Sequence, residues 1–131
     1  MRQLDLRFVP IGIAVWLAFL ILIRLIGPTV FTIGSPLLPI FYVLAIPITI
    51  VTIYLLSAVT RVPIQDMPMP VFVMTFTALL LDGIAVGFTS MYGETHDQIR
   101  AGAGFLLWGG GMGLVCTLLL AERARAAQRQ K

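Results

Sequence analysis

The chain has 131 residues, of which 59% are hydrophobic and only 11% are charged. Soluble domains carry about 25% charged residues, so this composition excludes an ordinary soluble domain. Nine basic and six acidic residues give a formal net charge of +3, and most of them stand at the ends of apolar runs, a pattern that orients membrane proteins and is not that of a nucleic-acid-binding surface.

Four apolar runs approach or exceed the ~20 residues that a helix needs to cross a hydrocarbon core of about 30 Å. A transmembrane barrel would instead alternate polar and apolar residues, whereas residues 11–23 are apolar at every position. We therefore predict an all-α polytopic protein in a lipid bilayer, with four transmembrane helices that form two hairpins within a single domain.

The first predicted span covers residues 8–26. Its length exceeds the roughly 7–15 residues of a signal-peptide core, and no cleavage site with small residues follows, so we expect a retained helix. Residues 27–36 are uncharged and bounded by Gly27 and Pro36, which predicts a turn at or near the membrane surface. Whether this turn re-enters the membrane stays open.

The second predicted span covers residues 37–59 and contains Pro47. A proline inside a helix removes one backbone hydrogen bond, so we expect Pro47 to kink this span. Thr49, Thr52 or a neighbouring helix would then bond the freed carbonyl.

A polar, proline-containing break at residues 60–68 separates the two halves of the chain. The third span is predicted over residues 69–91, and a hydrophilic loop follows at residues 92–98. The fourth span is predicted over residues 99–121. We expect the basic tail at residues 122–131 to prolong the last helix into the cytoplasm.

The basic residues are unevenly divided between the two ends of the predicted spans. Seven belong to the N-terminus, the central break and the tail, which four spans place on one side, whereas only Arg24 and Arg100 belong to the other. Because positively charged segments stay in the cytoplasm, we predict that both termini are cytoplasmic.

Asp82 needs an explanation, because it stands inside the apolar third span. The predicted outer end, Met91, lies nine residues further, which places Asp82 about 14 Å below the outer surface at ~1.5 Å per residue. Intramembrane acids usually pair with another group or line an ion path. The predicted spans contain no second acid, histidine or asparagine that could relay a proton.

Three interpretations of Asp82 stay open. Arg24, near the outer end of the first span, could form an ion pair with it across two helices. Alternatively, Arg24 reaches the outer headgroups, while Asp82 is neutral or bonded to a Ser, Thr or backbone group. In the third, Asp82 is a proton or cation site in a wet cavity. Trp108 is deep in the fourth span and needs an acceptor for its N–H, for which Asp82 is a candidate.

Glycines four residues apart give the last two predicted spans smooth faces: Gly83 with Gly87, and Gly109 with Gly113. Such faces let two helix backbones approach closely. We expect a tight hairpin between the third and fourth spans, or an interface between copies of the chain.

The remaining side chains with chemical potential have ordinary explanations. Tyr92 stands at the depth of an interfacial aromatic belt. Cys116, the single cysteine, excludes an intramolecular disulfide and is expected to pack in a helix. Glu94, His96 and Asp97 lie close together, but loop polarity accounts for them. No catalytic or phosphate-binding set can be assembled, so we expect no enzyme activity, cofactor or metal.

Four features stand out from Met69 onward: a proline near the start of the third span, Leu79-Leu80-Leu81-Asp82, Met91-Tyr92-Gly93 and Leu106-Leu107-Trp108-Gly109. In these features the chain resembles an uncharacterised family of small four-span bacterial membrane proteins. The resemblance implies a bacterial cytoplasmic (inner) membrane and carries no known activity. The small multidrug exporters are similar in length, but they have an acid in the first span, where this chain has Arg24.

Two classes of function fit these observations. The first is a non-catalytic accessory or scaffold subunit, or a homodimer or larger assembly, packed through glycine faces. The second is a small proton- or cation-coupled transporter or channel that uses Asp82. The substitution Asp82→Asn separates them, because a transporter should lose coupled flux, whereas a structural acid should affect stability or assembly.

Overall fold

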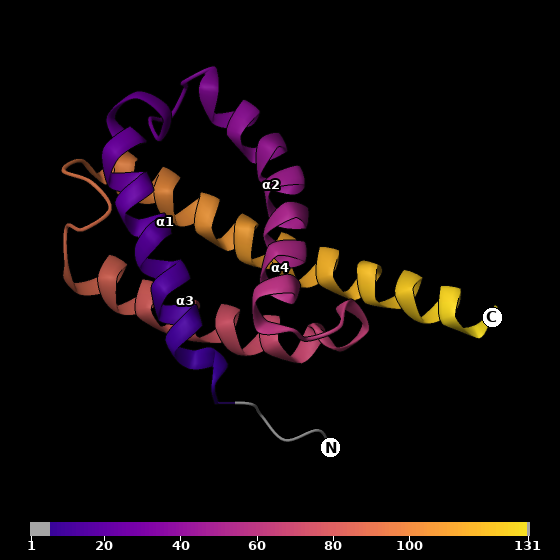
Figure 1. Cartoon of the computed structure of the whole chain (residues 1–131). Helices are drawn as coiled ribbons and strands as arrows, with labels where there is room; N and C mark the ends of the chain where they lie inside the picture. Colours follow the sequence, from indigo (N-terminus) through magenta and orange to yellow (C-terminus); the bar gives the residue numbers. More distant parts are fainter. Residues whose placement is uncertain (1–5, 131) are drawn as a thin grey trace.

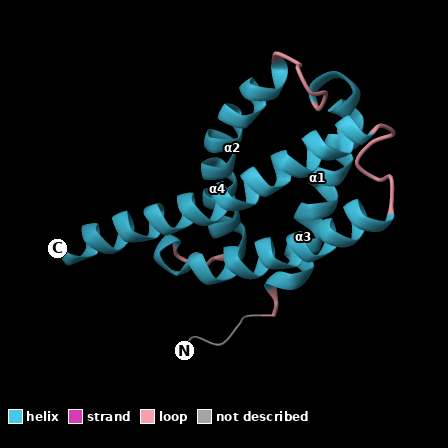
Figure 2. Ribbon diagram, turned by 180° about the vertical axis from the view of Figure 1, so that it is seen from behind, coloured by secondary structure: helices cyan, strands magenta, loops and turns pink. Residues whose placement is uncertain are grey.

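The computed structural model describes residues 6–130, which form helices joined by short turns and contain no β-strand (Figure 2). Each of the four long helices is long and apolar enough to cross a membrane, so the predicted all-α architecture with four helices of that length is confirmed. The helices are α1 (Phe8–Val30), α2 (Leu37–Thr60), α3 (Pro68–Phe88) and α4 (His96–Arg129), and a 3-10 turn, η1 (Ile64–Asp66), precedes α3.

Two helix ends differ from the predicted spans. α1 continues through Pro28, because a proline near a helix end removes only one backbone bond, and the amide of Phe31 closes the helix on the carbonyl of Gly27 at 2.9 Å. α3 stops at Phe88, three residues early, because the backbone of Thr89 is extended (φ −138°, ψ 166°). The amide and the hydroxyl of Thr89 both donate to the carbonyl of Ala85. The predicted turn at residues 27–36 is therefore shorter, and the loop after α3 lies three residues earlier than predicted, at residues 89–95.

α4 is a continuous helix of 34 residues. The hydroxyl of Thr95 caps it by accepting the amide of Gln98 at 3.2 Å, which brings His96 into the first turn. At ~1.5 Å per residue the helix is about 50 Å long and exceeds the hydrocarbon core. The basic tail prolongs the last helix to Arg129, as predicted. Arg2 and Lys131 lie outside the described residues.

The long helices pack in an order that the sequence did not predict. α1 packs mainly against α3 and α2 mainly against α4, while α3 and α4 pack on each other. α1 and α2 make few contacts, and Figures 1 and 2 show them as separate arms across the α3–α4 pair. α3 and α4 are therefore a packed pair, whereas α1 and α2 are each packed mainly on a later helix.

A close backbone approach joins α1 to α3 at Gly12. A Cβ at Gly12 would lie 3.0 Å from Cα and 3.1 Å from the carbonyl oxygen of Met74. Small residues permit such contact between membrane helices. The tight glycine contact that we expected between the third and fourth spans thus occurs between α1 and α3.

The predicted glycine pairs make no comparable contact within the chain. An added Cβ at each of their positions would meet no atom beyond its own stretch of helix within 4 Å. These positions are Gly83, Gly87, Gly109 and Gly113.

Buried side chains form two clusters at the two ends of the helices. The first lies near the turn after α1 and includes Ile23, Phe31 and Phe105. The second lies near η1 and includes Phe8 and Met67. The middle of the molecule, between these clusters, is hollow.

Polar contacts join the loops at each end. Arg125 of α4 donates to the carbonyl of Gln65 in η1 at 2.8 Å, so the central loop lies beside the tail.

α2 contains Pro47 within the helix, and its ribbon bends between the two ends (Figure 1). The hydroxyl of Thr52 donates to Ile48 at 2.8 Å and not to Val43, the carbonyl that Pro47 frees, so the role expected of Thr52 was wrong.

Candidate functional site

Asp82 meets side chains from two other segments. Trp16 of α1 donates its Nε1–H to Asp82 Oδ1 at 2.7 Å, and the hydroxyl of Tyr92, in the loop after α3, donates to the same oxygen. Trp16 Nε1 also lies 3.1 Å from the Tyr92 hydroxyl oxygen. We call these three residues the Asp82 cluster, since a single carboxyl oxygen joins all of them.

The contact between α1 and α3 explains why Trp16 reaches Asp82. Residues four apart lie on one helix face, so Trp16 stands one turn above Gly12. The close approach of Gly12 to Met74 holds the two backbones together, and Asp82 lies two turns beyond Met74. The same face of α1 therefore carries the indole to the carboxyl group.

The loop after α3 carries Tyr92 back over Asp82. The side chain of Gln98 accepts the amide of Glu94 at 3.0 Å and packs against Gly93, where an added Cβ would lie 2.6 Å from Gln98 Cβ. Tyr92 is only 1% exposed, so its expected place in an interfacial belt was wrong. Burial raises the pKa of Tyr92, and the hydrogen bond and charge of Asp82 raise it further.

The structure does not join Arg24 to Asp82. The guanidinium of Arg24 lies 3.3 Å from the carboxylate of Glu94 and 3.2 Å from the carbonyl oxygen of Ser90. Because α3 ends early, the following loop returns to the level of Arg24, while Asp82 lies about 9 Å deeper, six residues before Phe88. The ion pair considered from the sequence is therefore replaced by an exposed one.

Trp108 also has a different partner from the candidate acid. Its Nε1–H donates to the carbonyl oxygen of Tyr42 at 3.0 Å, and its ring stacks on that of Tyr42 at 5.8 Å between centroids. Tyr42 in turn contacts Phe105 edge to face at 5.6 Å. Trp108 thus belongs to the contact between α2 and α4 and not to the Asp82 cluster.

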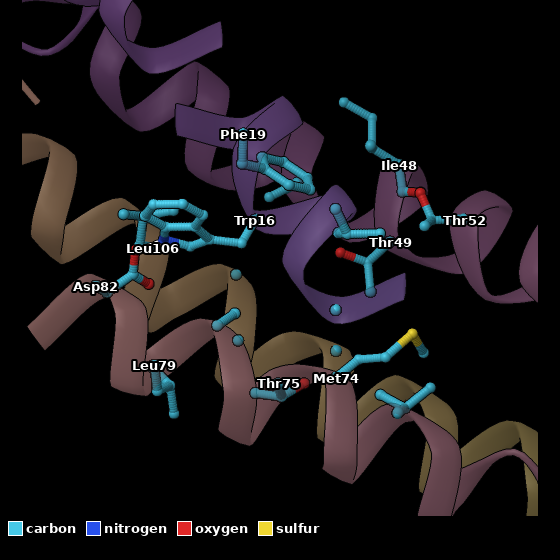
Figure 3. A pocket seen from close by; sticks show the side chains of 18 of the residues that line it. Trp16, Phe19, Ile48, Thr49, Thr52, Met74, Thr75, Leu79, Asp82 and Leu106 are labelled. Carbon is cyan, nitrogen blue, oxygen red and sulfur yellow. Dashed lines mark hydrogen bonds between the residues drawn. The ribbon is translucent and has the colours of Figure 1, made fainter. Parts of the chain in front are cut away.

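The Asp82 cluster lies at one end of a cavity of about 210 Å³ that is lined by all four long helices. Figure 3 shows Trp16 beside Asp82 at that end, Met74 further along α3 and Thr49 reaching in from α2. Asp82 is the single ionisable side chain among the lining residues. The cavity is otherwise almost entirely apolar.

Glycines on α4 create part of this space. Gly109 and Gly113 line the cavity, and no neighbouring side chain approaches their missing Cβ positions. Gly109 and Gly113, which were predicted to pack against a neighbouring helix, therefore line the cavity instead. Gly83 and Gly87, by contrast, are exposed on the outer side of α3.

The cavity opens sideways between α1 and α2. Leu22 of α1 and Ile48 of α2 both line it, yet they are 44% and 52% exposed. Because α1 and α2 make few contacts with each other, little protein covers this side of the cavity. In a bilayer this opening would face acyl chains.

A second, polar pocket of about 300 Å³ lies on the other side of Tyr92. Arg24, Glu94 and Gln98 contribute its polar side chains, and Tyr92 forms part of its wall. Tyr92 also bonds to Asp82, so the Asp82 cluster separates the polar pocket from the apolar cavity.

Neither metal-binding clusters nor known relatives assign a chemistry to this site. Among residues 6–130, no three His, Cys, Asp or Glu side chains gather where they could hold a metal ion. No family model, curated protein or solved structure matches the chain. The resemblance to a four-span bacterial family therefore stays a prediction.

Sequence reasoning missed Trp16 and Tyr92 as partners of Asp82. A usable signal existed for Trp16, because an indole in the middle of an apolar span needs an acceptor at similar depth. The same requirement holds for Trp108, so the sequence alone did not show which of the two tryptophans bonds to Asp82. Tyr92 gave no such signal, since its position depends on how the loop after α3 folds.

Proposed function

We propose that this chain is a non-catalytic four-span protein of the bacterial cytoplasmic membrane that binds a slim apolar molecule drawn from the bilayer. The observation that carries this proposal is the apolar cavity among the four long helices. The positions of Leu22 and Ile48 supply an entrance from the lipid side.

The size of the cavity suits a slim guest. Apolar cavities of about 150 Å³ bind benzene in other proteins, so a cavity of about 210 Å³ can hold a single ring or part of an alkyl chain. Larger ligand sites typically measure about 300–1,000 Å³. A bulky polycyclic molecule would therefore not fit without a rearrangement.

Quenching by bromooctane tests this proposal. The variant Trp108→Phe leaves Trp16, which lines the cavity, as the single tryptophan. In nonionic maltoside micelles we expect saturable quenching of Trp16, which Gly113→Leu should reduce at least fivefold by filling the cavity.

Gly111→Leu is the matched control, because Gly111 is on the same helix, does not line the cavity and has open space at its Cβ position. It should keep the saturable quenching. Quenching that rises linearly and equally in all three proteins would contradict binding in the cavity.

We also propose that both termini are cytoplasmic. The proposal is supported by the excess of basic residues at one end of the spans and by the contact between Arg125 and Gln65, which groups the tail with the central loop. Arg24 and Glu94 then lie at the opposite, outer end.

Coupled transport is the second candidate function. It is favoured by the place of Asp82, which lies between an apolar cavity and a polar pocket. Asp82→Asn keeps an oxygen that can accept from Trp16 and Tyr92, so it removes the charge and retains an acceptor. A transporter should then lose proton flux into vesicles while the unfolding midpoint stays near the wild-type value.

An accessory role through self-association stays the alternative to transport. Gly83 and Gly87 face outward with open space at their Cβ positions, so a second helix could approach them. Gly83→Leu should then lower the oligomer mass in mild detergent. An unchanged mass would argue against this interface.

A further inference from the structure

Only one of the two carboxyl oxygens of Asp82 accepts hydrogen bonds from the part of the chain that the structure describes. Both hydrogen bonds that the cluster supplies go to Oδ1. Among residues 6–130, no group donates to Oδ2. Asp82 also lines the cavity, so a guest in the cavity can approach this carboxyl group.

Within residues 6–130, no basic side chain pairs with this acid. The cavity lining contains no Lys, Arg or His, and Arg24 is engaged by Glu94 and Ser90. A carboxylate within a membrane needs an opposite charge or hydrogen-bond donors to offset the loss of water. Two donors reach Oδ1, and a positive charge is missing.

The walls around Asp82 favour a cation as the missing partner. Trp16 lies against the carboxyl group, and Phe19 and Phe105 also line the cavity. Aromatic faces attract ammonium groups, and the attraction grows as water is excluded. The rest of the cavity is apolar and slim, so it suits an unbranched tail.

We propose that the cavity binds membrane-partitioned amines, in which one ammonium group sits on a single slim apolar chain. The ammonium contacts Asp82, and the chain fills the cavity along α4 past Gly109. A longer tail leaves between Leu22 and Ile48 into the lipid. This assignment rests on the proposed function and names its ligand class.

The depth of Asp82 separates such amines from phospholipid headgroups. Asp82 lies about 9 Å inside the end of α3, and the cavity lining offers no basic side chain for a phosphate. An aminophospholipid would have to bring its phosphate to this depth. A single-chain amine carries no such group.

Three probes of one chain length test the ligand class. Octylamine, 1-octanol and octanoate are titrated into the Trp108→Phe protein in nonionic maltoside micelles, and the fluorescence of Trp16 is followed. We expect octylamine to bind at least tenfold more tightly than 1-octanol, with octanoate weakest. Equal affinities for octylamine and 1-octanol would overturn the proposal.

Variants at Asp82 test whether this residue causes the preference for octylamine over 1-octanol. Asp82→Asn should weaken octylamine binding at least tenfold, so that octylamine no longer binds more tightly than 1-octanol, and an unfolding midpoint near the wild-type value shows that the variant is folded. Asp82→Glu, which keeps the charge, should retain a preference for the amine. A preference that survives in Asp82→Asn would place the ammonium elsewhere and overturn the assignment.

Added phospholipid distinguishes the source of the amine. Phosphatidylethanolamine in the micelles should leave the octylamine affinity unchanged, whereas a tenfold loss would assign the site to lipid headgroups and overturn our choice. If bromooctane binds but the amine has no advantage, this inference alone fails. If no probe binds saturably, the proposed function fails with it.

Discussion

At the scale of single residues, the hydrogen bonds of Asp82 decide how α1, α3 and the following loop meet. Trp16 and Tyr92 both donate to one carboxyl oxygen, and each comes from a different segment. The sequence predicted that Asp82 needed a partner, because an acid in an apolar span is costly. It could not identify the partner, since Arg24 and Trp108 also have donors. The early end of α3 brings Arg24 to Glu94 instead, and the packing of α4 on α2 brings Trp108 to the carbonyl of Tyr42.

The two tryptophans provide a matched comparison at this scale. Trp16→Phe removes a donor to Asp82, and we expect a loss of about 1.5–3 kcal/mol in the free energy of unfolding, as for hydrogen bonds to charged groups. Trp108→Phe removes a donor to a backbone carbonyl, and about 1 kcal/mol is expected. Unfolding in mixed micelles containing dodecyl sulfate measures both. A larger loss for Trp108→Phe would contradict the importance of the Asp82 cluster.

Tyr92 predicts a pH dependence. Its pKa in the folded protein lies above the ordinary value of 10.0, mainly because it is buried. Between the ordinary pKa of tyrosine and the raised pKa of Tyr92 in the folded protein, the unfolded chain has lost a proton that the folded chain still holds. The free energy of unfolding should therefore fall as the pH rises above about 10. Unfolding midpoints between pH 8 and 11 measure the effect.

Tyr92→Phe should reduce this fall, since it removes the titrating group. Trp108→Phe serves as the control, because it removes a hydrogen bond without removing a titrating group, and it should leave the wild-type pH dependence intact. The same pH profile in Tyr92→Phe as in the wild type would rule out Tyr92 as its source.

At the scale of whole helices, the glycines divide into those that permit contact and those that leave space. The sequence predicted contact at the pairs spaced by four residues, because that motif lets membrane helices approach. In the structure the close approach uses Gly12, while Gly109 and Gly113 line the cavity. Spacing within one helix cannot distinguish the two outcomes, since they depend on what the facing helix presents.

Alanine substitutions test this division. Gly12→Ala places a methyl group 3.0 Å from the backbone of Met74, so the helices must separate, and we expect a loss of about 1–3 kcal/mol. Gly111→Ala meets open space and should be neutral or stabilising by up to about 1 kcal/mol through helix propensity. Equal stability of the two variants would argue against a tight contact between α1 and α3.

At the scale of the whole molecule, two packed ends enclose a hollow middle. Length and hydropathy predicted the four helices to within a few residues, because the thickness of a bilayer sets the length of an apolar run. The order of packing was not predicted, because apolar side chains face lipid and protein alike. A surface helix of a soluble protein would show an apolar stripe, and these helices are apolar all round.

Labelling with a membrane-impermeant maleimide tests the proposed orientation. In a Cys116→Ala background, Glu94→Cys should be labelled from outside intact cells, since Glu94 is 84% exposed at the predicted outer end. Gln128→Cys in the tail should be labelled only after the membrane is opened. Labelling of both in intact cells would exclude a single orientation with both termini inside.

The divergence of α1 and α2 has a mechanical consequence. In a bilayer, acyl chains would face the space between these two helices, because α1 and α2 make few contacts with each other and Leu22 and Ile48 are exposed beside it. The separation of α1 and α2 would then respond to lateral pressure, which varies with the length and unsaturation of the acyl chains. Membrane composition would act on the shape of the protein in the same sense as temperature or pH.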